Sequence, residues 1–298
     1  MSRTKAYAFA ISGAALWGLT GLFVQFLYDY GFTPWQVVAI RAIFSGLLIV
    51  SYLSIFNPSY LKINLRDLPF FIGTGIISIV FFNWCFFTVI DETSISLAVV
   101  LLYTGPFFVT LLSRFLFKEW LTKRKVAALF VTIAGCAFTV GLLPSFNTSV
   151  SGFAIITGIG SGFFYALYSI FGKYVSRKYH SLTITAWSFI CASTLMLPAG
   201  GLLPQAGLFL DLRVLFFAAG LALIPTVLAY IFYTIGLTYI ESSRASILST
   251  IEPVVALFVG FAVFGDQLGG WQMAGAALVL SSIFLVSEKK RISSSRGL

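Results

Sequence analysis

The sequence predicts an all-α integral membrane protein, with ten transmembrane helices arranged as two inverted five-helix repeats. Charged residues make up only 10% of the chain, whereas soluble domains carry about 25%. Apolar segments of about 20 residues, the length that a helix needs to cross a bilayer, recur from one end of the chain to the other. The connections between them are too short for a soluble domain, so we expect residues 1–298 to form a single membrane domain.

The expected spans follow directly from the apolar runs. They cover residues 6–28, 34–56, 68–90, 94–117, 123–143, 152–175, 182–204, 214–238, 243–265 and 269–287. The first run is longer than the core of a secretory signal, typically ~7 to 15 residues, so we expect it to be retained as a helix. Prolines at Pro198, Pro204 and Pro225 make the seventh and eighth spans the least regular ones.

The basic residues predict the orientation of these spans. With ten spans, sixteen of the nineteen Lys and Arg residues fall on the same side as both termini, and only Arg213 falls in a loop on the other side. Basic loops stay in the cytoplasm, so we predict a multi-pass protein of the plasma (cell) membrane with both termini cytoplasmic. The net charge of +9 is then a topological signal, and no nucleic-acid partner is expected.

The chain also repeats internally. A shift of 147 residues aligns the fourth expected span with the ninth. The matched pairs are Ser96–Ser243, Ala98–Ala245, Leu101–Leu248, Pro106–Pro253, Phe117–Phe264, Glu119–Asp266 and Leu121–Leu268. A weaker match at about the same shift sets Trp17 of the first span beside Tyr165 of the sixth. The halves are then 6–143 and 152–287, and because each holds an odd number of spans, they must insert in opposite orientations.

These features together resemble the EamA-type branch of the drug/metabolite transporter superfamily. The resemblance rests on ten spans in two halves, on Trp17-Gly18 in the first span, and on a mid-helix proline followed thirteen residues later by an acid in each half. It implies a secondary carrier with a central cavity between the halves, and many members export amino acids or other small metabolites. This chain departs from the pattern in having Asp266 where Glu is commoner.

Glu252 is the only acidic residue that we place within a span, directly before Pro253. An ionisable group at that depth costs about 2.5 to 3.5 kcal/mol on insertion scales, so such groups are usually functional or paired. Three roles are open: an acid that couples transport to protons, a partner for a cationic substrate, or a cap for the helix break. Pro106 and Pro253 are expected to break their helices, but Gly105 precedes Pro106, so Glu252 has no counterpart in the first half.

Arg41 is the second ionisable candidate, about seven residues inside the second span. Its guanidinium could bind a substrate carboxylate bidentately, or it could extend to the outer interface. Aromatic residues at the expected midplane could form a pocket for an apolar body or an ammonium group. Because aromatics make up 17% of the chain, packing or lipid contact is nevertheless the more common role expected for most of them. The predicted substrate-binding residues are Trp17, Arg41, Asn83, Trp84, Tyr103, Tyr165, Tyr168 and Tyr230.

Glu119 and Asp266 end matching spans on opposite faces of the membrane. An acid near a helix C-terminus is unfavourable with the helix dipole, so we expect each to have a partner. For Glu119 this partner could be Lys123, and for either acid it could be the first N–H groups of the following helix. A capping or gating role is the preferred interpretation.

The sequence offers little to an enzyme. His180 is the only histidine, no GxxxxGK[ST] or HExxH run occurs, and the three cysteines match no metal spacing. We therefore predict no catalytic residue, cofactor or metal, and a secondary transporter of small organic metabolites that exports amino acids or related compounds. The alternatives are a carrier of lipid-like or drug-like amphiphiles and an intramembrane enzyme. The expected partners are a small-molecule substrate and the bilayer, with the protein a monomer or homodimer.

Overall fold

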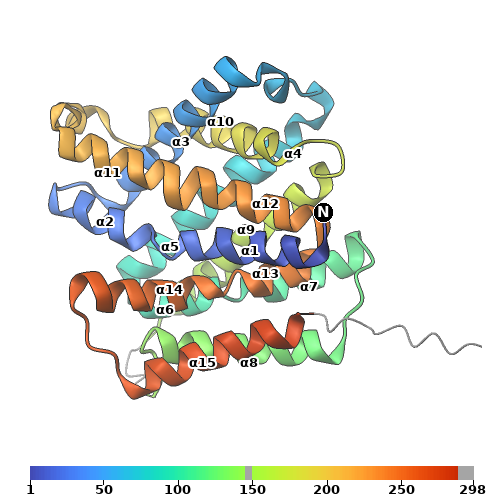
Figure 1. The fold of residues 1–298 in the computed structure, drawn as a ribbon. Helices are drawn as coiled ribbons and strands as arrows, with labels where there is room; N and C mark the ends of the chain where they lie inside the picture. Colours follow the sequence, from blue (N-terminus) through green and yellow to red (C-terminus); the bar gives the residue numbers. More distant parts are fainter. Residues whose placement is uncertain (145–149, 288–298) are drawn as a thin grey trace, which may run out of the picture.

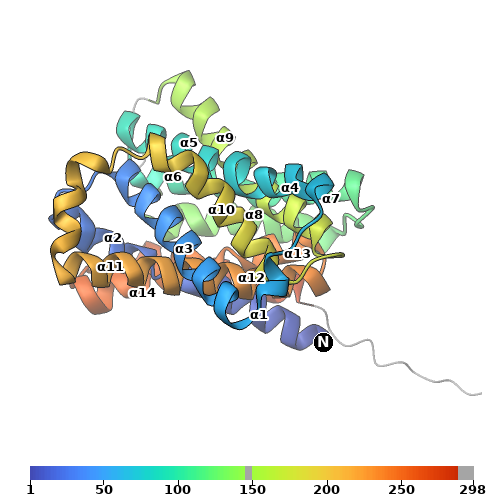
Figure 2. The ribbon, with the colours of Figure 1, turned by 90° about the horizontal axis from the view of Figure 1, so that it is seen from above.

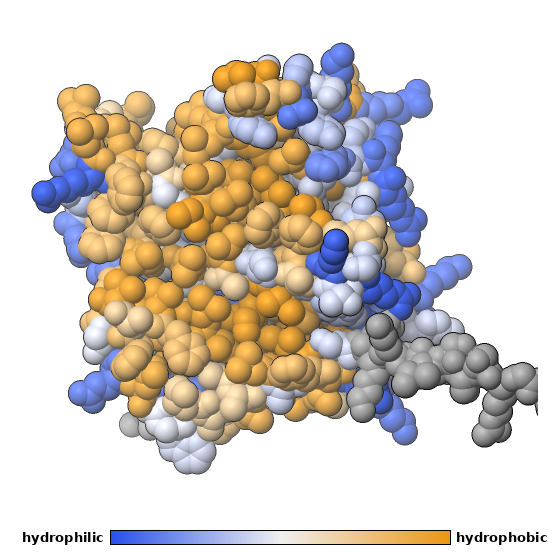
Figure 3. Space-filling view, viewed as in Figure 1, coloured by the Kyte–Doolittle hydropathy of each residue, from blue (hydrophilic) through white to orange (hydrophobic). Residues whose placement is uncertain are grey.

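The computed structural model describes residues 1–144 and 150–287 of the chain. In this part of the chain, eight helices are long and apolar enough to cross a membrane. Two further helices, at Lys123–Thr139 and Gly270–Val286, are shorter, with 17 residues each. Together they account for the ten predicted spans. Apolar residues cover a broad band across the bundle, with hydrophilic residues gathered towards its two ends (Figure 3), as a bilayer requires.

Both halves of the chain follow the same order of helices (Figure 1). The first half contains α1 (Arg3–Trp17), α2 (Thr20–Asp29), α3 (Pro34–Phe56), η1 (Pro58–Leu61), η2 (Leu65–Asp67), α4 (Leu68–Ile72), η3 (Gly73–Val80), α5 (Phe81–Glu92), α6 (Ile95–Leu102), α7 (Gly105–Leu116) and α8 (Lys123–Thr139). The second half contains α9 (Gly152–Val175), α10 (Ser181–Ala199), η4 (Leu203–Leu210), α11 (Leu212–Ala222), η5 (Leu223–Leu228), α12 (Ala229–Tyr239), α13 (Ser242–Leu248), α14 (Ile251–Val259), η6 (Gly260–Phe264) and α15 (Gly270–Val286).

Most predicted spans agree with these bounds within a few residues, but the seventh does not. We expected it to run to residue 204, whereas α10 ends at Ala199. Gly201 has a φ of +61°, and a left-handed glycine just after a helix ends it. The chain then forms the separate short helix η4, Leu203–Leu210. The four basic residues of the orientation argument between 289 and 296 lie outside the described residues.

The two halves interleave in space. The main pairings are α8 with α15, α1 with α12, α3 with α10 and α5 with α9, and each joins one helix from each half. Under the shift of 147 residues α1 corresponds to α9 and α5 to α12, so the α1–α12 pairing is repeated as α9–α5. The core of the molecule is therefore the interface between the halves, and a site at its centre receives side chains from both.

Both halves also carry a π-helical segment in the corresponding span, η3 at Gly73–Val80 and η5 at Leu223–Leu228. In η5 the cause is local. Pro225 has no N–H to donate to Leu221, and the Thr226 hydroxyl donates to the Leu221 carbonyl instead, at 2.8 Å. The Ala229 N–H, which would donate to the Pro225 carbonyl in a regular α-helix, donates to the Thr226 carbonyl, and the Pro225 carbonyl contributes to the candidate site.

Candidate substrate-binding site

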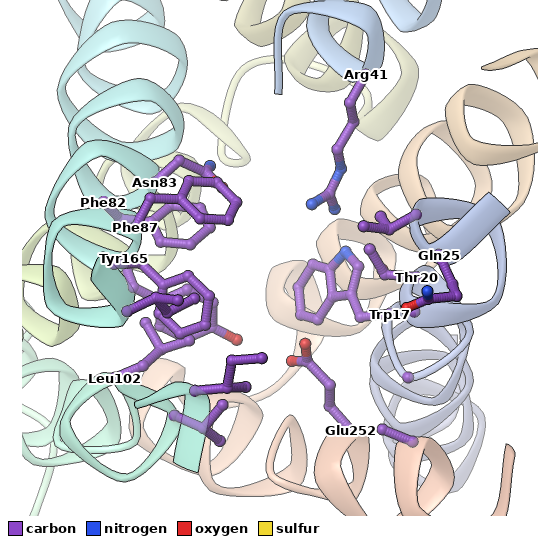
Figure 4. Close-up of a pocket in the computed structure, with 18 of the residues that line it drawn as sticks. Trp17, Thr20, Gln25, Arg41, Phe82, Asn83, Phe87, Leu102, Tyr165 and Glu252 are labelled. Atoms are coloured by element: carbon purple, nitrogen blue, oxygen red, sulfur yellow. The ribbon is translucent and has the colours of Figure 1, made fainter. Parts of the chain in front are cut away.

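A cavity of about 380 Å³ lies between the halves, and Figure 4 shows the side chains that line it. A volume of this size fits a small organic molecule. The lining residues are Trp17, Gly18, Thr20, Gly21, Val24, Gln25, Tyr28, Arg41, Phe82, Asn83, Phe86, Phe87, Ile90, Ile95, Val99, Leu102, Tyr165, Tyr230, Glu252 and Ala256. The cavity extends towards the end of the bundle where Gln25 and Ile95 are exposed. That is the predicted outer end.

Glu252 lies at the base of the cavity, in the first turn of α14. The helix is interrupted just before it, between the end of α13 at Leu248 and the start of α14 at Ile251. The side chain is half-buried, and its carboxylate lies close to the Tyr103 hydroxyl. Gly18 allows the first span to cross at this point, because a Cβ there would lie 2.7 Å from the Glu252 carbonyl oxygen.

Arg41 extends from α3 into the opposite side of the cavity (Figure 4). Its Nε donates to the Thr226 Oγ1 at 2.9 Å, and one terminal nitrogen donates to the Pro225 carbonyl at 3.2 Å. The guanidinium carbon also lies 5.9 Å from the centre of the Tyr230 ring. The π-helical turn of η5 therefore holds the arginine in the cavity, which removes the alternative that its side chain extends to the outer interface. Its other N–H groups remain for a ligand.

Trp17 lies between these two charged groups (Figure 4). Its side chain is only 5% exposed and makes an edge contact with Tyr230, at 5.1 Å between ring centres. The indole Nε1 is buried and has no hydrogen-bond partner among the described residues. A buried N–H without an acceptor is costly, so this donor is suited to an acceptor on a bound ligand.

The structure brings most of the predicted substrate-binding residues together. Trp17, Arg41, Asn83, Tyr165 and Tyr230 line the cavity beside Glu252. Tyr165 is positioned by a hydrogen bond from its hydroxyl to the Ser249 Oγ, at 3.3 Å, and so ties α9 to the helix break. Asn83 donates to the carbonyl of Ile79 in its own helix at 2.6 Å, which leaves its amide oxygen as the atom that can accept from a ligand.

Three of the predicted residues lie elsewhere. Tyr103 is buried behind Glu252 and contacts the carboxylate from outside the cavity. Tyr168 is also buried, and its hydroxyl shares a hydrogen bond with Thr234 at 2.8 Å. Trp84 is 52% exposed and borders an outer groove with Trp35. It follows Asn83 on the same helix, and since consecutive residues are about 100° apart around a helix, it points away from the cavity.

Several lining residues were missed from the sequence. Thr20 and Gln25 are polar residues within the first apolar run, and this was a usable signal. Phe82 and Phe87 form much of the aromatic wall opposite Trp17 (Figure 4), but nothing distinguishes them from the other phenylalanines of the chain, of which there are 32 in all. In the described part of the chain, no group of three or more His, Cys, Asp or Glu side chains could hold a metal ion.

Glu119 has a partner, but not the one that we expected. Its carboxylate accepts from the backbone N–H of Ser242 at 2.6 Å and of Ser243 at 3.1 Å, and from the Ser243 hydroxyl. The nearest cation is Lys125, at 4.0 Å, and not Lys123. The helix that Glu119 caps is α13 of the other half, and not the following helix α8, because the interleaving of the halves brings the start of α13 beside the end of α7.

Comparisons with known proteins agree with this architecture. The EamA-like transporter family matches the chain twice, at residues 4–141 and 152–288. The "Uncharacterized inner membrane transporter YicL" of Salmonella typhimurium is 24% identical over 300 residues, covering 97% of each chain. The "Probable amino-acid metabolite efflux pump" of the same organism is 25% identical over 298 residues, covering 96% of this chain and 95% of the relative.

A solved structure has the same fold. It superposes with a TM-score of 0.81 over 96% of this chain and 97% of the solved chain, at 16% sequence identity, and is described only as "Crystal structure of protein". At that identity the likeness concerns the arrangement of the helices alone.

Proposed function

Since this chain belongs to the EamA-like transporter family, we propose that it moves amino acids or closely related zwitterions across the cell membrane by alternating access. The chain is a multi-pass membrane transporter and not an enzyme. Export from the cytoplasm, with both termini on the cytoplasmic side, is part of the proposal. The name of the Salmonella typhimurium relative, "Probable amino-acid metabolite efflux pump", supports the substrate class. The halves 6–143 and 152–287 are proposed as the two inverted repeats of this chain, which together line the cavity.

The observation that carries the substrate class is the placement of two opposite charges in one apolar cavity. Arg41 and Glu252 lie on opposite sides, with Trp17 between them (Figure 4). A charge at the membrane midplane is costly unless it is paired. An amino acid with an apolar side chain brings a carboxylate for Arg41, an ammonium for Glu252 and a hydrophobic body for the aromatic walls.

Arg41 would bind the carboxylate end. Thr226 and Pro225 already hold two of its donors, so the guanidinium is oriented before the ligand arrives, which reduces the entropy cost of binding. The unpaired indole N–H of Trp17 would supply one more donor for a carboxylate oxygen. Charge-assisted hydrogen bonds of this kind are the strong ones.

Glu252 would bind the ammonium end and could couple transport to protons. A carboxylate that binds either a substrate ammonium or a proton exchanges one for the other, which would drive export by proton entry. The ring of Tyr165, which lines the cavity near Glu252, would attract the ammonium. An uncharged amphiphile would leave both Arg41 and Glu252 without an opposite charge.

The proposal is tested by flux measurements on the purified chain in proteoliposomes. The labelled panel contains an amino acid with an apolar side chain, its N-acetyl derivative without the ammonium, and its amide without the carboxylate. Flux is measured with and without a pH gradient. We expect only the zwitterion to be transported rapidly, and the gradient to accelerate it. Equal flux of all three compounds, or flipping of a fluorescent phospholipid without solute flux, would contradict the zwitterion class.

A further inference from the structure

The acids Glu119 and Asp266 occupy the same backbone geometry in the two halves. Each follows a residue with left-handed backbone, Lys118 with a φ of +57° and Gly265 with a φ of +75°. Each donates its own N–H to the carbonyl six residues earlier, Glu119 to Ser113 at 3.3 Å and Asp266 to Gly260 at 3.2 Å. In both halves this bond closes the C-terminal end of the helix in the same way. The repeat therefore presents a carboxylate in the same way at each end of the bundle.

The two carboxylates nevertheless differ in their contacts. Glu119 is buried and accepts from the first N–H groups of α13. Asp266 is exposed, and within residues 1–144 and 150–287 no hydrogen bond or ion pair holds its carboxylate. One acid is engaged and its counterpart is free.

The counterpart of the α13 helix start is also free. Under the shift of 147 residues, Ser242 and Ser243 correspond to Ile95 and Ser96 at the start of α6. The first N–H groups of a helix have no partner within the helix, and no described residue accepts from those of Ile95 or Ser96. The Ser96 hydroxyl donates to the Val140 carbonyl at 2.7 Å, whereas the Ser243 hydroxyl donates to Glu119. The first N–H groups of α6 are therefore able to donate to a carboxylate that caps the helix at the Asp266 end of the bundle.

Helix packing shows the same asymmetry. The α7 helix packs against both α9 and α13. The α7–α9 pairing has a repeat counterpart, because α14 packs against α1. The counterpart of the α7–α13 pairing would join α14 to α6, but these two helices have almost no contact. Figure 2 shows them on opposite sides of the molecule, whereas α7 and α13 lie at the same end. The bundle is closed at the Glu119 end and open at the Asp266 end.

We infer that Glu119 and Asp266 are paired gating residues that close the cavity alternately. In the present state Glu119 holds α7 against the start of α13. In the opposite state Glu119 releases these N–H groups, and Asp266 accepts from Ile95 and Ser96 as α14 closes on α6. This inference rests on the alternating access proposed above. It adds which side chains hold each end shut, and it gives the shared acid of the repeat a function distinct from that of the unshared Glu252.

The test measures both ends of the bundle by electron paramagnetic resonance distance spectroscopy, on the full chain in lipid nanodiscs. Spin labels on cysteines at Leu116 and Tyr239 report the Glu119 end, and both positions are exposed. Their counterparts 147 residues away are Val263 and Glu92, also exposed, and this pair reports the Asp266 end. The native cysteines are buried, so the unsubstituted chain supplies the labelling background.

Glu119→Gln should shift the balance towards the opposite state. The amide presents an NH₂ group where a carboxylate oxygen now accepts, so at least one charge-assisted hydrogen bond is lost. We expect the ratio of open to closed molecules at the 116–239 pair to rise about tenfold, as the loss of one such bond allows. The 92–263 distance should shorten in the same proportion. Asp266→Glu, which lengthens the free acid, should shift both distances in the same direction, and Asp266→Asn should not.

The outcomes separate the gate from the proposed function. If saturating amino acid interconverts the two distance sets while Glu119→Gln and Asp266→Glu change neither, the carrier alternates and the gating inference is wrong. If Glu119→Gln lengthens 116–239 without shortening 92–263, Glu119 is only a helix cap, and the inference is again wrong. Coupled shifts of both distances in both variants support it, even when none of the panel compounds is transported.

Discussion

The broken helices α6–α7 and α13–α14 are repeats of one structural element, and they differ in the residue that follows the break. Both breaks precede a proline at matching positions, Pro106 and Pro253. The residue before the proline is Gly105 in the first half and Glu252 in the second. The helix break is therefore present in both halves, whereas the carboxylate is present in only one of them.

The residues that cross these two breaks also differ: a glycine crosses the break that carries Glu252, and a tyrosine crosses the break that carries Gly105. In the second half the break crosses Gly18, whose Cβ would lie 2.7 Å from the Glu252 carbonyl oxygen. In the first half it crosses Tyr165, which lies 147 residues from Gly18, and a Cβ at Gly105 would lie 2.9 Å from its ring. Each crossing combines one glycine with one large side chain that reaches the cavity. A symmetric backbone therefore supports an asymmetric site.

The strongest test of this comparison removes the unshared acid. Glu252→Gln should lower the flux of an apolar amino acid by about 100-fold, which corresponds to the loss of a charge-assisted interaction of about 2.7 kcal/mol. The remaining flux should no longer depend on a pH gradient. Proteoliposome flux measures both. The matched control is Glu92→Gln, an exposed acid outside the cavity, and equal losses in the two variants would remove Glu252 from the mechanism.

The next test compares the two glycine crossings. Gly18→Ala places a methyl group against the backbone of α14, and such overpacking costs about 1–3 kcal/mol. In Gly105→Ala the nearest backbone atom, the Gly162 carbonyl oxygen, is 3.2 Å away, compared with 2.7 Å for the Glu252 carbonyl oxygen at Gly18, so this change should cost less. Melting temperatures of the purified variants measure the difference. Gly21→Ala, which meets open space, is the control, and a greater loss in Gly105→Ala than in Gly18→Ala would contradict the comparison.

Arg41→Lys tests the other side of the cavity. A lysine keeps the charge, but its three N–H donors are too few to hold Thr226 and Pro225 and also bind a carboxylate through both oxygens. We expect about tenfold weaker binding of the amino acid and little change for its amide, measured by the concentration dependence of flux. Arg114→Lys is the control, because Arg114 lies over the Trp120 ring at the end of α7, away from the cavity. Equal effects on the acid and the amide would remove the carboxylate role of Arg41.

The smallest effect concerns the pH dependence of the closed end. Burial alone would raise the pKa of Glu241, but hydrogen bonds from Arg244 and Lys125 outweigh it and lower that pKa from its ordinary 4.5. An acid with a lowered pKa stabilises the folded state above its unfolded pKa, and this stabilisation is lost as the pH falls through the folded pKa. The stabilisation by Glu241 should therefore be complete and independent of pH near neutrality, and the melting temperature should fall as the pH is lowered below about 4.5. In Glu241→Gln the part of this fall that is due to Glu241 should be absent. If the melting temperature of the variant depends on pH as it does in the unsubstituted chain, Glu241 does not contribute in this way.

Much of the candidate site could be selected from the sequence. Glu252 and Arg41 stand out because ionisable groups in apolar spans are costly, and Trp17 stands out by its depth. Trp84 was a wrong choice for the cavity, since neighbouring residues on a helix face different directions and only the rotation of α5 decides which one points inward. Phe82 and Phe87 could not have been chosen, because phenylalanine is ordinary in a membrane helix.

The sequence by itself determined the ten apolar spans, the proline breaks and the repeat at a shift of 147 residues. These are local or periodic properties, and the bilayer imposes them on each segment separately. Only the tertiary structure decided that the halves interleave, that Arg41 is held by the π-helical turn of η5, and that Glu119 caps α13 while Asp266 is free. The contacts of Arg41 and Glu119 join residues from different halves, so no local or periodic property of the sequence specifies them.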